Sequence, residues 1–225
     1  MGRPEVFLSE VLNDENANAS KYINLAELPE LPYEEGDISA GNFIIIDPAN
    51  DKKDSDEVAI GYFEIYDTKP VLMEVRADRF SPGDMIRVAL EMALRNRCAL
   101  IAVESNAYQF SILYWFKFIT RQRNIQGIYC VDIYSGVKAK TQRILKMLQA
   151  YAAGELFVDH STRLLVHKEI SEFNPLVKDN KDNILDLLTY APRVMQEYKQ
   201  FLTSGDVIEG EDYYEAEVLE DNTEF

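Results

Sequence analysis

The stretch from Gly41 to Ala49, Gly-Asn-Phe-Ile-Ile-Ile-Asp-Pro-Ala, constrains the fold of this chain more than any other. Its apolar run contains β-branched isoleucines and predicts a strand that is buried on both faces. Asp47 ends the run, and Pro48 stops further strand pairing because it has no N–H to donate. A carboxylate at the end of a buried strand can serve as a metal ligand on a rigid element. Since an Asp-Pro pair can also simply open a turn, the rest of the chain has to decide between these interpretations.

The other apolar segments alternate between expected strands and expected helices. Ser81, followed by Pro82 and Asp84, is typical of a helix N-terminus, and Gly154 is typical of a helix end. The expected strands are 41–47, 58–66, 71–75, 98–104, 128–134 and 156–158, and the expected helices are 82–97, 107–123, 138–153, 163–173 and 181–201. Three antiparallel strands followed by this alternation predict an α/β fold, in which parallel strands extend the sheet through right-handed crossovers. The prediction is therefore a mixed sheet with helices on both faces.

Composition divides the chain into three parts. Residues 1–40 are expected to be a linker, and residues 41–204 to be the α/β domain. Residues 205–225 contain nine acidic residues and no Lys or Arg, so that residues 1–204 carry −7 of the net charge of −16. An acidic segment of this kind is usually solvated and disordered.

The net charge, the length of the apolar runs and the cysteine content also argue against several classes of protein. A net charge of −16 argues against a protein that grips nucleic acid with its whole surface. No apolar run approaches the ~20 residues that cross a bilayer, and the N-terminus lacks the pattern of a secretory signal, so no membrane partner is expected. Cys98 and Cys130 lie in apolar strand-like runs, which predicts core residues in a reducing compartment and not a disulfide or a metal pair.

Four acidic residues lie at the ends of expected elements. Asp47 and Glu104 each end a buried strand, and Asp182 and Asp186 lie four apart at the start of the last helix, so they can share one face. Oxygen ligands that converge from separate elements suit Mg²⁺ or Mn²⁺, and two such ions can support an in-line phosphoryl displacement. Each acid also has a structural explanation, as a helix cap, a turn residue or a partner of a helix dipole.

Short motifs around these acids resemble one known family. Asp47-Pro48-Ala49, the turn from Val103 to Asn106 and the segment from Lys181 to Asp186 are similar to the three acidic motifs of the nuclease domain of viral (bacteriophage) terminase large subunits. That domain is ribonuclease H-like and is related to Holliday-junction resolvases. The segments from Lys140 to Leu156 and from Phe7 to Asp14 also resemble parts of the family, the latter the region that joins its ATPase to its nuclease. The resemblance covers roughly residues 5–200.

The resemblance implies an activity and a set of ligands. Asp47, Glu104, Asp182 and Asp186 would be the catalytic, metal-binding acids, holding two Mg²⁺ or Mn²⁺ ions in an endonuclease that cuts concatemeric viral DNA during genome packaging. It implies as partners double-stranded DNA, an ATPase motor domain, a small terminase subunit and the portal, in the host cell cytoplasm and transiently at the capsid portal. Many members have two adjacent Asp residues in the last motif, where this chain has Asn183 in the second place. Which of Asp182 and Asp186 is the direct ligand therefore stays open.

Basic and aromatic residues in two expected helices allow two interpretations each. Lys138, Lys140 and Arg143 could contact DNA phosphates or form a solvated helix face. The aromatic residues of 107–123 could stack bases, but a helix so rich in aromatics is predicted to pack in the core; they are Tyr108, Phe110, Tyr114, Trp115, Phe116 and Phe118.

Features that the sequence lacks define the alternatives. Residues 136–141 only superficially resemble a nucleotide-binding loop, because the glycine before the lysine is missing, so no ATPase activity is expected in this chain. An actin-like ATPase is disfavoured for the same reason. Two alternatives stay open: a structure-selective resolvase acting on four-way junctions, and a non-catalytic DNA-packaging interaction module that keeps the fold as a scaffold.

Overall fold

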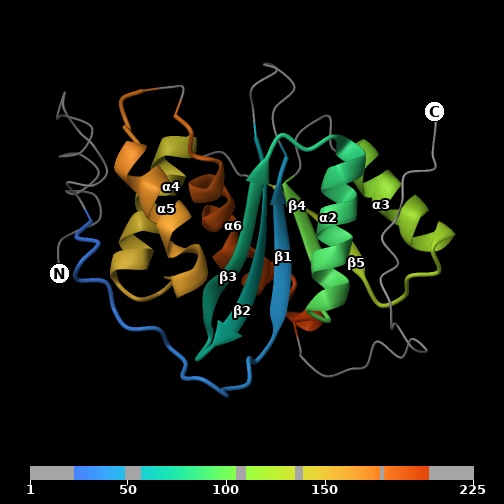
Figure 1. The fold of residues 1–225 in the computed structure, drawn as a ribbon, viewed down its shortest axis with the longest axis horizontal. Helices are drawn as coiled ribbons and strands as arrows, with labels where there is room; N and C mark the ends of the chain where they lie inside the picture. The colour runs from blue at the N-terminus through green and yellow to red at the C-terminus, as the bar shows by residue number, and fades with distance from the viewer. Residues whose placement is uncertain (1–22, 49–56, 105–109, 135–138, 178–179, 203–225) are drawn as a thin grey trace.

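The computed structural model describes residues 23–48, 57–104, 110–134, 139–177 and 180–202 (Figure 1). Residues 1–22 of the linker expected at 1–40, and the acidic segment expected after residue 204, lie outside these ranges. Residues 23–40 are described, and Ile23 is buried in the main core while Tyr33 stacks on Tyr66. In the described part of the chain, no helix is both long enough and apolar enough to cross a membrane.

A six-stranded sheet forms the centre of the molecule, with the strand order β5-β4-β1-β2-β3-β6. The strands are β1 (Asn42–Asp47), β2 (Val58–Tyr66), β3 (Lys69–Asp78), β4 (Leu100–Glu104), β5 (Tyr129–Ile133) and β6 (Phe157–Val158). β2 pairs antiparallel with β1 and with β3, whereas β4, β5 and β6 join through parallel pairs. The predicted ribonuclease H-like mixed sheet, with three antiparallel strands followed by parallel ones, is confirmed.

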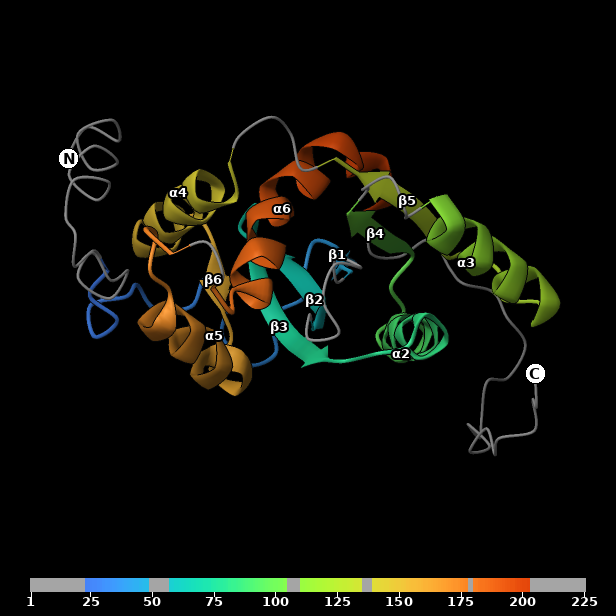
Figure 2. The same cartoon turned by 90° about the horizontal axis from the view of Figure 1, so that it is seen from above.

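Helices cover both faces of the sheet, as predicted (Figure 2). They are α2 (Pro82–Arg95), α3 (Phe110–Gln122), α4 (Lys140–Ala152), α5 (His160–Glu172) and α6 (Asn183–Glu197), and a short 3-10 helix, η2 (Lys199–Phe201), follows. Ile44 and Ile46 of β1 point to the face covered by α2 and α3, while Phe43 and Ile45 point to the face covered by α4, α5 and α6. The central strand is therefore buried on both sides, which explains its unbroken apolar run.

Helix boundaries follow the predicted end signals. Ser81 is the N-cap of α2, and its side chain accepts a hydrogen bond from the Asp84 backbone N–H at 3.1 Å. Gly154 follows the C-cap of α4 with a φ of +70°, a conformation that favours glycine.

α6 lies close against the middle of the sheet because the residues beneath it are small. A Cβ atom built on Gly61 of β2 would lie 2.7 Å from a methyl carbon of Leu187 in α6. Ala59, two residues earlier on the same face, is fully buried in the same core. Gly61 therefore sets the depth at which α6 packs on β2.

The chain that enters β1 and the last described residue lie at one place. A Cβ atom on Gly41, just before β1, would lie 1.7 Å from the backbone oxygen of Leu202. The entering chain is also held by hydrogen bonds, since the Ala40 N–H donates to the Ile65 carbonyl at 2.8 Å and the Ile65 N–H donates to the Gly41 carbonyl at 2.9 Å. Gly41 and Leu202 thus meet at the amino end of β1.

The structure corrects the prediction that the aromatic residues of α3 pack in the core. Phe116 is fully buried, but Tyr114, Trp115 and Phe118 are 63%, 48% and 46% exposed. α3 contacts the domain with one narrow side at the sheet edge, so most of its circumference faces solvent (Figure 2). The side chains of Tyr108 and Phe110 lie outside the described part.

Candidate metal centre

Two neighbouring strands bring the first two acids together. β1 and β4 pair in parallel with Ile46 opposite Val103, so Asp47 and Glu104, the last residue of each strand, lie side by side at the carboxyl edge of the sheet. Both point to the α6 face because side chains alternate along a strand. They are 7% and 6% exposed, which is rare for carboxylates without a neutralising partner.

α6 supplies the other two acids. Asp182 is the residue before the helix, and Asp186 lies in its first turn, where its N–H donates to the Asp182 carbonyl at 2.8 Å. Carboxylate oxygens of Asp47, Glu104 and Asp186 all lie within 4.8 Å of one another. The structure thus brings three of the predicted acids into one cluster, and Asp182, although buried, is not among these three.

Burial and mutual repulsion make the cluster electrostatically costly when it is fully ionised. Burial raises the Asp47 carboxyl pKa well above its ordinary value, and a hydrogen bond to Glu104 and the charges of Glu104 and Asp186 raise it further. Burial likewise raises the Asp186 pKa, although Lys140 and Arg143 oppose the shift. A bound cation would remove this cost, since an opposite charge favours ionised carboxylates.

Two basic side chains from α4 partly neutralise the acids. Lys140 Nζ lies 2.8 Å from Asp182 Oδ1 and 3.4 Å from Asp186 Oδ2, and Arg143 Nη2 lies 2.7 Å from Asp186 Oδ1. Burial acts to lower the Lys140 pKa, but the charges of Asp186, Asp182 and Asp47 outweigh it and leave the pKa raised. Two of the residues singled out in the sequence as DNA contacts therefore lie at the acidic cluster, and the third, Lys138, lies outside the described residues.

Tyr190 completes the cluster and was missed in the sequence. Its hydroxyl donates to Glu104 Oε1 at 2.6 Å and accepts from Arg143 Nη2 at 3.1 Å. Tyr190 follows Asp186 by one helical turn, so both share one face of α6. That spacing was a usable signal, because a tyrosine on a buried helix face needs a partner for its hydroxyl.

Glu169 of α5 holds the start of α6 in place. Its buried Oε2 accepts hydrogen bonds from the backbone N–H groups of Ile184 and Leu185 at 3.0 and 3.2 Å. It therefore does the capping that Asp182 does not, since the Asp182 side chain makes no cap hydrogen bond. Burial raises the Glu169 pKa to about 7, although both backbone hydrogen bonds oppose the shift. Nothing in the local sequence signals a cap supplied from another helix.

The donor set fits a hard divalent cation. Carboxylate oxygens are the ligands of Mg²⁺ and Mn²⁺, whereas zinc sites usually include His or Cys. Each of the three clustered acids sits on a strand or helix, so the ligands are held rigidly. Among the described residues, Asp47, Glu104 and Asp186 form the group that could hold a metal.

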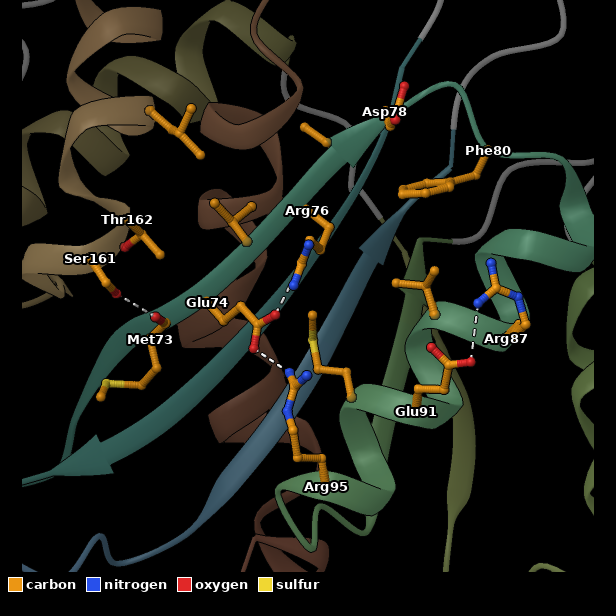
Figure 3. A pocket seen from close by; sticks show the side chains of 15 residues that line it. Met73, Glu74, Arg76, Asp78, Phe80, Arg87, Glu91, Arg95, Ser161 and Thr162 are labelled. Carbon is orange, nitrogen blue, oxygen red and sulfur yellow. Dashed lines mark hydrogen bonds and ion pairs between the residues drawn. The ribbon is translucent and has the colours of Figure 1, made fainter. Parts of the chain in front are cut away.

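A cavity elsewhere in the described structure does not involve these acids. It has a volume of about 970 Å³ and lies over β3 between α2 and the start of α5. Its charged side chains neutralise one another: Glu74 accepts from Arg76 and Arg95, and Arg87 pairs with Glu91 (Figure 3). Because Glu74 and Arg76 alternate with core residues facing α6, this cavity lies on the opposite face of the sheet from the acidic cluster.

Comparison with known proteins identifies the fold. No protein-family model and no curated protein matches this sequence. Solved structures do match: the human cytomegalovirus terminase nuclease domain has a TM-score of 0.55 at 12% identity, covering 83% of this chain and 98% of that one. The P22 large terminase nuclease domain has a TM-score of 0.56 at 11% identity, covering 84% and 95%.

The large terminase of a thermophilic bacteriophage also matches. Its TM-score is 0.55 at 12% identity, and the match covers 79% of this chain but 45% of the phage chain. The cytomegalovirus domain has in addition been solved soaked with Mn and with an inhibitor bound. At these identities the similarity shows a shared fold, and the resemblance to terminase nuclease domains noted in the sequence is confirmed at that level.

Proposed function

We propose that this domain is the metal-dependent DNA endonuclease of a viral DNA-packaging terminase large subunit, and that it cuts concatemeric viral DNA. The observation that carries the proposal is the buried cluster of Asp47, Glu104 and Asp186 within 4.8 Å, in a fold shared with terminase nuclease domains. Three buried carboxylates this close together have little structural purpose, because each raises the electrostatic cost of the others.

In this proposal the cluster holds two Mg²⁺ or Mn²⁺ ions. When bound, such ions lower the pKa of the attacking water and stabilise the leaving oxygen of the scissile phosphate. Asp47, Glu104 and Asp186 are the proposed direct ligands, with Asp182 beside them. Tyr190 keeps Glu104 oriented through its hydroxyl, and Glu169 keeps α6 in position, so the ligand geometry is set before substrate arrives.

Lys140 and Arg143 have two parts in the proposed reaction. They neutralise Asp182 and Asp186 while no metal is bound, as their contacts of 2.7–3.4 Å indicate. With DNA at the carboxyl edge of the sheet, the same cations lie within reach of phosphate oxygens, as predicted for them together with Lys138.

The wider setting of the activity is also a proposal. It comprises double-stranded DNA as substrate, residues 1–40 as a linker to an ATPase motor domain, and a small terminase subunit and portal as partners in the host cell cytoplasm. The large terminase of the thermophilic bacteriophage supports this arrangement, because the present chain matches 45% of its length.

A plasmid cleavage assay tests the proposal. Supercoiled DNA is incubated with the protein and Mg²⁺ or Mn²⁺, with EDTA as the metal-free control, alongside Asp47→Asn and Asp186→Asn. We expect nicking and linearisation by the wild type and a loss of at least about 100-fold in each variant, because each removes a ligand charge. Glu155→Gln, at an exposed acid remote in sequence from the cluster, is the matched control and should cut normally.

Four results would contradict the proposal. One is cleavage by Asp47→Asn at the wild-type rate, and another is cleavage that persists in EDTA. Absence of cutting by folded wild-type protein with either metal would favour the non-catalytic module. If a four-way junction is cut far faster than linear duplex, the activity belongs to a resolvase.

A further inference from the structure

The solvent-facing side of α3 carries an exposed aromatic cluster, formed by Tyr114, Trp115 and Phe118. The Trp115 ring contacts both neighbours edge to face, with centroid distances of 5.8 Å to Tyr114 and 5.6 Å to Phe118. Large aromatic side chains that lie side by side on a protein surface usually mark a site where another segment or molecule binds.

The last part of α3, together with Arg123 just after it, is basic in an otherwise acidic chain. Lys117, Arg121 and Arg123 are exposed, and no Asp or Glu occurs from Phe110 to Val131. Within the described residues, none of the three cations takes part in an ion pair, whereas Arg76, Arg87, Arg95 and Arg193 all do. We call Tyr114, Trp115, Lys117, Phe118, Arg121 and Arg123 the α3 face.

This face is separate from the proposed nuclease site. The buried side of α3, through Ile112 and Phe116, packs into the core shared with α2. The acidic cluster lies on the other side of the sheet, against α6. Figure 2 shows α3 at one end of the molecule, beyond the edge strand β5. The cations of the α3 face are therefore not needed to neutralise Asp47, Glu104 or Asp186.

We propose that the chain's own acidic segment, residues 205–225, docks on the α3 face. The segment has nine acidic residues and no Lys or Arg, and large apolar residues are interspersed among the acids or, for the last, follow them: Val207, Ile208, Tyr213, Tyr214, Val218, Leu219 and Phe225. An acidic segment with interspersed aromatics matches a surface of cations with interspersed aromatics, in charge and in apolar character. This inference is independent of the nuclease proposal.

The chain leaves the described domain near the amino end of β5. Leu202 directly follows Phe201, whose ring lies 4.8 Å from that of Tyr129 in β5, and β5 is the edge strand against which α3 packs. A flexible chain of about 20 residues spans about 25 Å on average, while a 13-residue helix is about 20 Å long. The acidic segment can therefore reach the whole α3 face.

Because the acidic segment belongs to the same chain as the α3 face, even a weak intrinsic affinity is enough for it to occupy that face. A segment joined by a short flexible linker is present at an effective concentration on the order of mM, so an intrinsic affinity of that order half-occupies the face. A DNA duplex lacks this advantage, and it would approach a chain with a net charge of −16.

The chain provides its own probe, because Trp115 is its one tryptophan. Selective excitation of tryptophan in the full-length protein, with quenching by neutral acrylamide, reports how accessible the α3 face is. We expect low quenching at 20 mM salt and an increase of about twofold at 0.5 M KCl, because screening at that ionic strength shortens the range of the attraction to a few Å.

Two variants of the full chain test the contact from both sides. One replaces Lys117, Arg121 and Arg123 with Glu, and the other replaces the nine acidic residues of 205–225 with Asn or Gln. Each should raise quenching at low salt by about twofold and remove the salt effect. The matched control replaces exposed cations elsewhere, Arg79, Arg97 and Lys168, with Glu, and should behave as the wild type. Far-UV circular dichroism confirms that each variant is folded.

Two outcomes would overturn the proposal. In the first, Trp115 of the wild type is quenched at low salt as strongly as in the variant with the neutral segment, which means that nothing covers the face. In the second, the wild type is unprotected until a 20-base-pair duplex is added, which assigns the face to DNA. Neither outcome changes the expected result of the plasmid cleavage assay.

Discussion

At the scale of single residues, Lys140 is a cation that two of the buried acids share while no metal is bound. Its ammonium lies 2.8 Å from Asp182 and 3.4 Å from Asp186, so one positive charge is shared by two buried carboxylates. A divalent ion that uses either carboxylate has to compete with that ammonium. The lysine therefore reduces the free-energy cost of folding when no metal is bound, and it weakens the binding of a divalent ion.

Replacing Lys140 should tighten metal binding. For Lys140→Gln we expect Mn²⁺ to bind about tenfold more tightly in the absence of DNA, because the competing cation is gone and about 1.4 kcal/mol corresponds to tenfold. The same variant should be less stable without metal, since it leaves Asp182 and Asp186 less neutralised. Isothermal titration calorimetry with Mn²⁺ measures the affinity.

Lys146 offers the matched control for that measurement, because it is exposed on the same helix and makes no ion pair among the described residues. Lys146→Gln should bind Mn²⁺ as the wild type does. Weaker Mn²⁺ binding by Lys140→Gln would show that the lysine supports the metal site instead of competing with it.

At the scale of secondary-structure elements, α6 determines the geometry of the cluster, because it carries Asp186 and Tyr190 and packs on the centre of the sheet. Two features outside α6 fix its place: the missing side chain at Gly61 and the cap from Glu169. Neither touches the three clustered carboxylates in a recorded contact, yet both set where α6 lies.

Adding one methyl group at Gly61 should displace α6. The new Cβ of Gly61→Ala would lie 2.7 Å from Leu187, so we expect a loss of about 1–3 kcal/mol in unfolding free energy and weaker Mn²⁺ binding. Urea denaturation and calorimetry measure the two effects. Gly83→Ala is the control, because its Cβ would meet nothing closer than 3.9 Å; equal effects in both variants would refute the close-packing argument.

Removing the cap should loosen the start of α6. Glu169→Ala leaves two buried N–H groups without an acceptor, which should cost about 1–3 kcal/mol, whereas Glu169→Gln keeps an acceptor oxygen. The raised pKa of about 7 against an ordinary 4.5 means that the folded state holds the proton more tightly. The wild type should therefore lose stability as pH rises through about 7.

Glu169→Gln should show a flatter stability curve between pH 5 and pH 8, because it has no proton to lose. Urea denaturation at several pH values makes the comparison. If Glu169→Gln keeps the full pH dependence of the wild type, Glu169 does not contribute to it.

The positions of the strands and helices were largely predictable from the sequence, whereas the contacts that side chains make across the fold were not. Asp47 and Glu104 stand out because each ends an unbroken apolar run, and Ser81 and Gly154 mark helix ends through local backbone chemistry. Lys140 contacts Asp182 and Asp186 from another helix, and Glu169 caps α6 from α5. Both roles therefore depend on packing that no local pattern encodes. Gly61 was an available signal, since a glycine inside a strand often marks a close approach. The exposure of Trp115 was mispredicted because composition does not reveal which helices lie at a sheet edge.

At the scale of the whole molecule, pH and metal should act on stability together. Burial raises the pKa values of Asp47 and Asp186 as well as that of Glu169, so the metal-free fold should lose stability as pH rises from the ordinary carboxyl range. Mn²⁺ at 100 times its dissociation constant should restore about 2.7 kcal/mol, or about 5–10 °C in Tm. The gain should be larger at pH 8 than at pH 5.5, because ligands must be deprotonated.

Thermal unfolding followed by circular dichroism, with and without Mn²⁺ at both pH values, tests this expectation. The double variant Asp47→Asn, Asp186→Asn should show no shift with Mn²⁺. A shift of equal size in that variant would place the stabilising ion elsewhere.

The meeting of Gly41 and Leu202 has a mechanical consequence. A pulling force applied through residues 40 and 202 would load that contact and the amino end of β1. Asp47 ends the same strand, which at six residues is about 20 Å long, so the acidic cluster lies off the line of tension. A domain held in this way can be dragged or swung as a rigid body while its carboxyl edge keeps its shape.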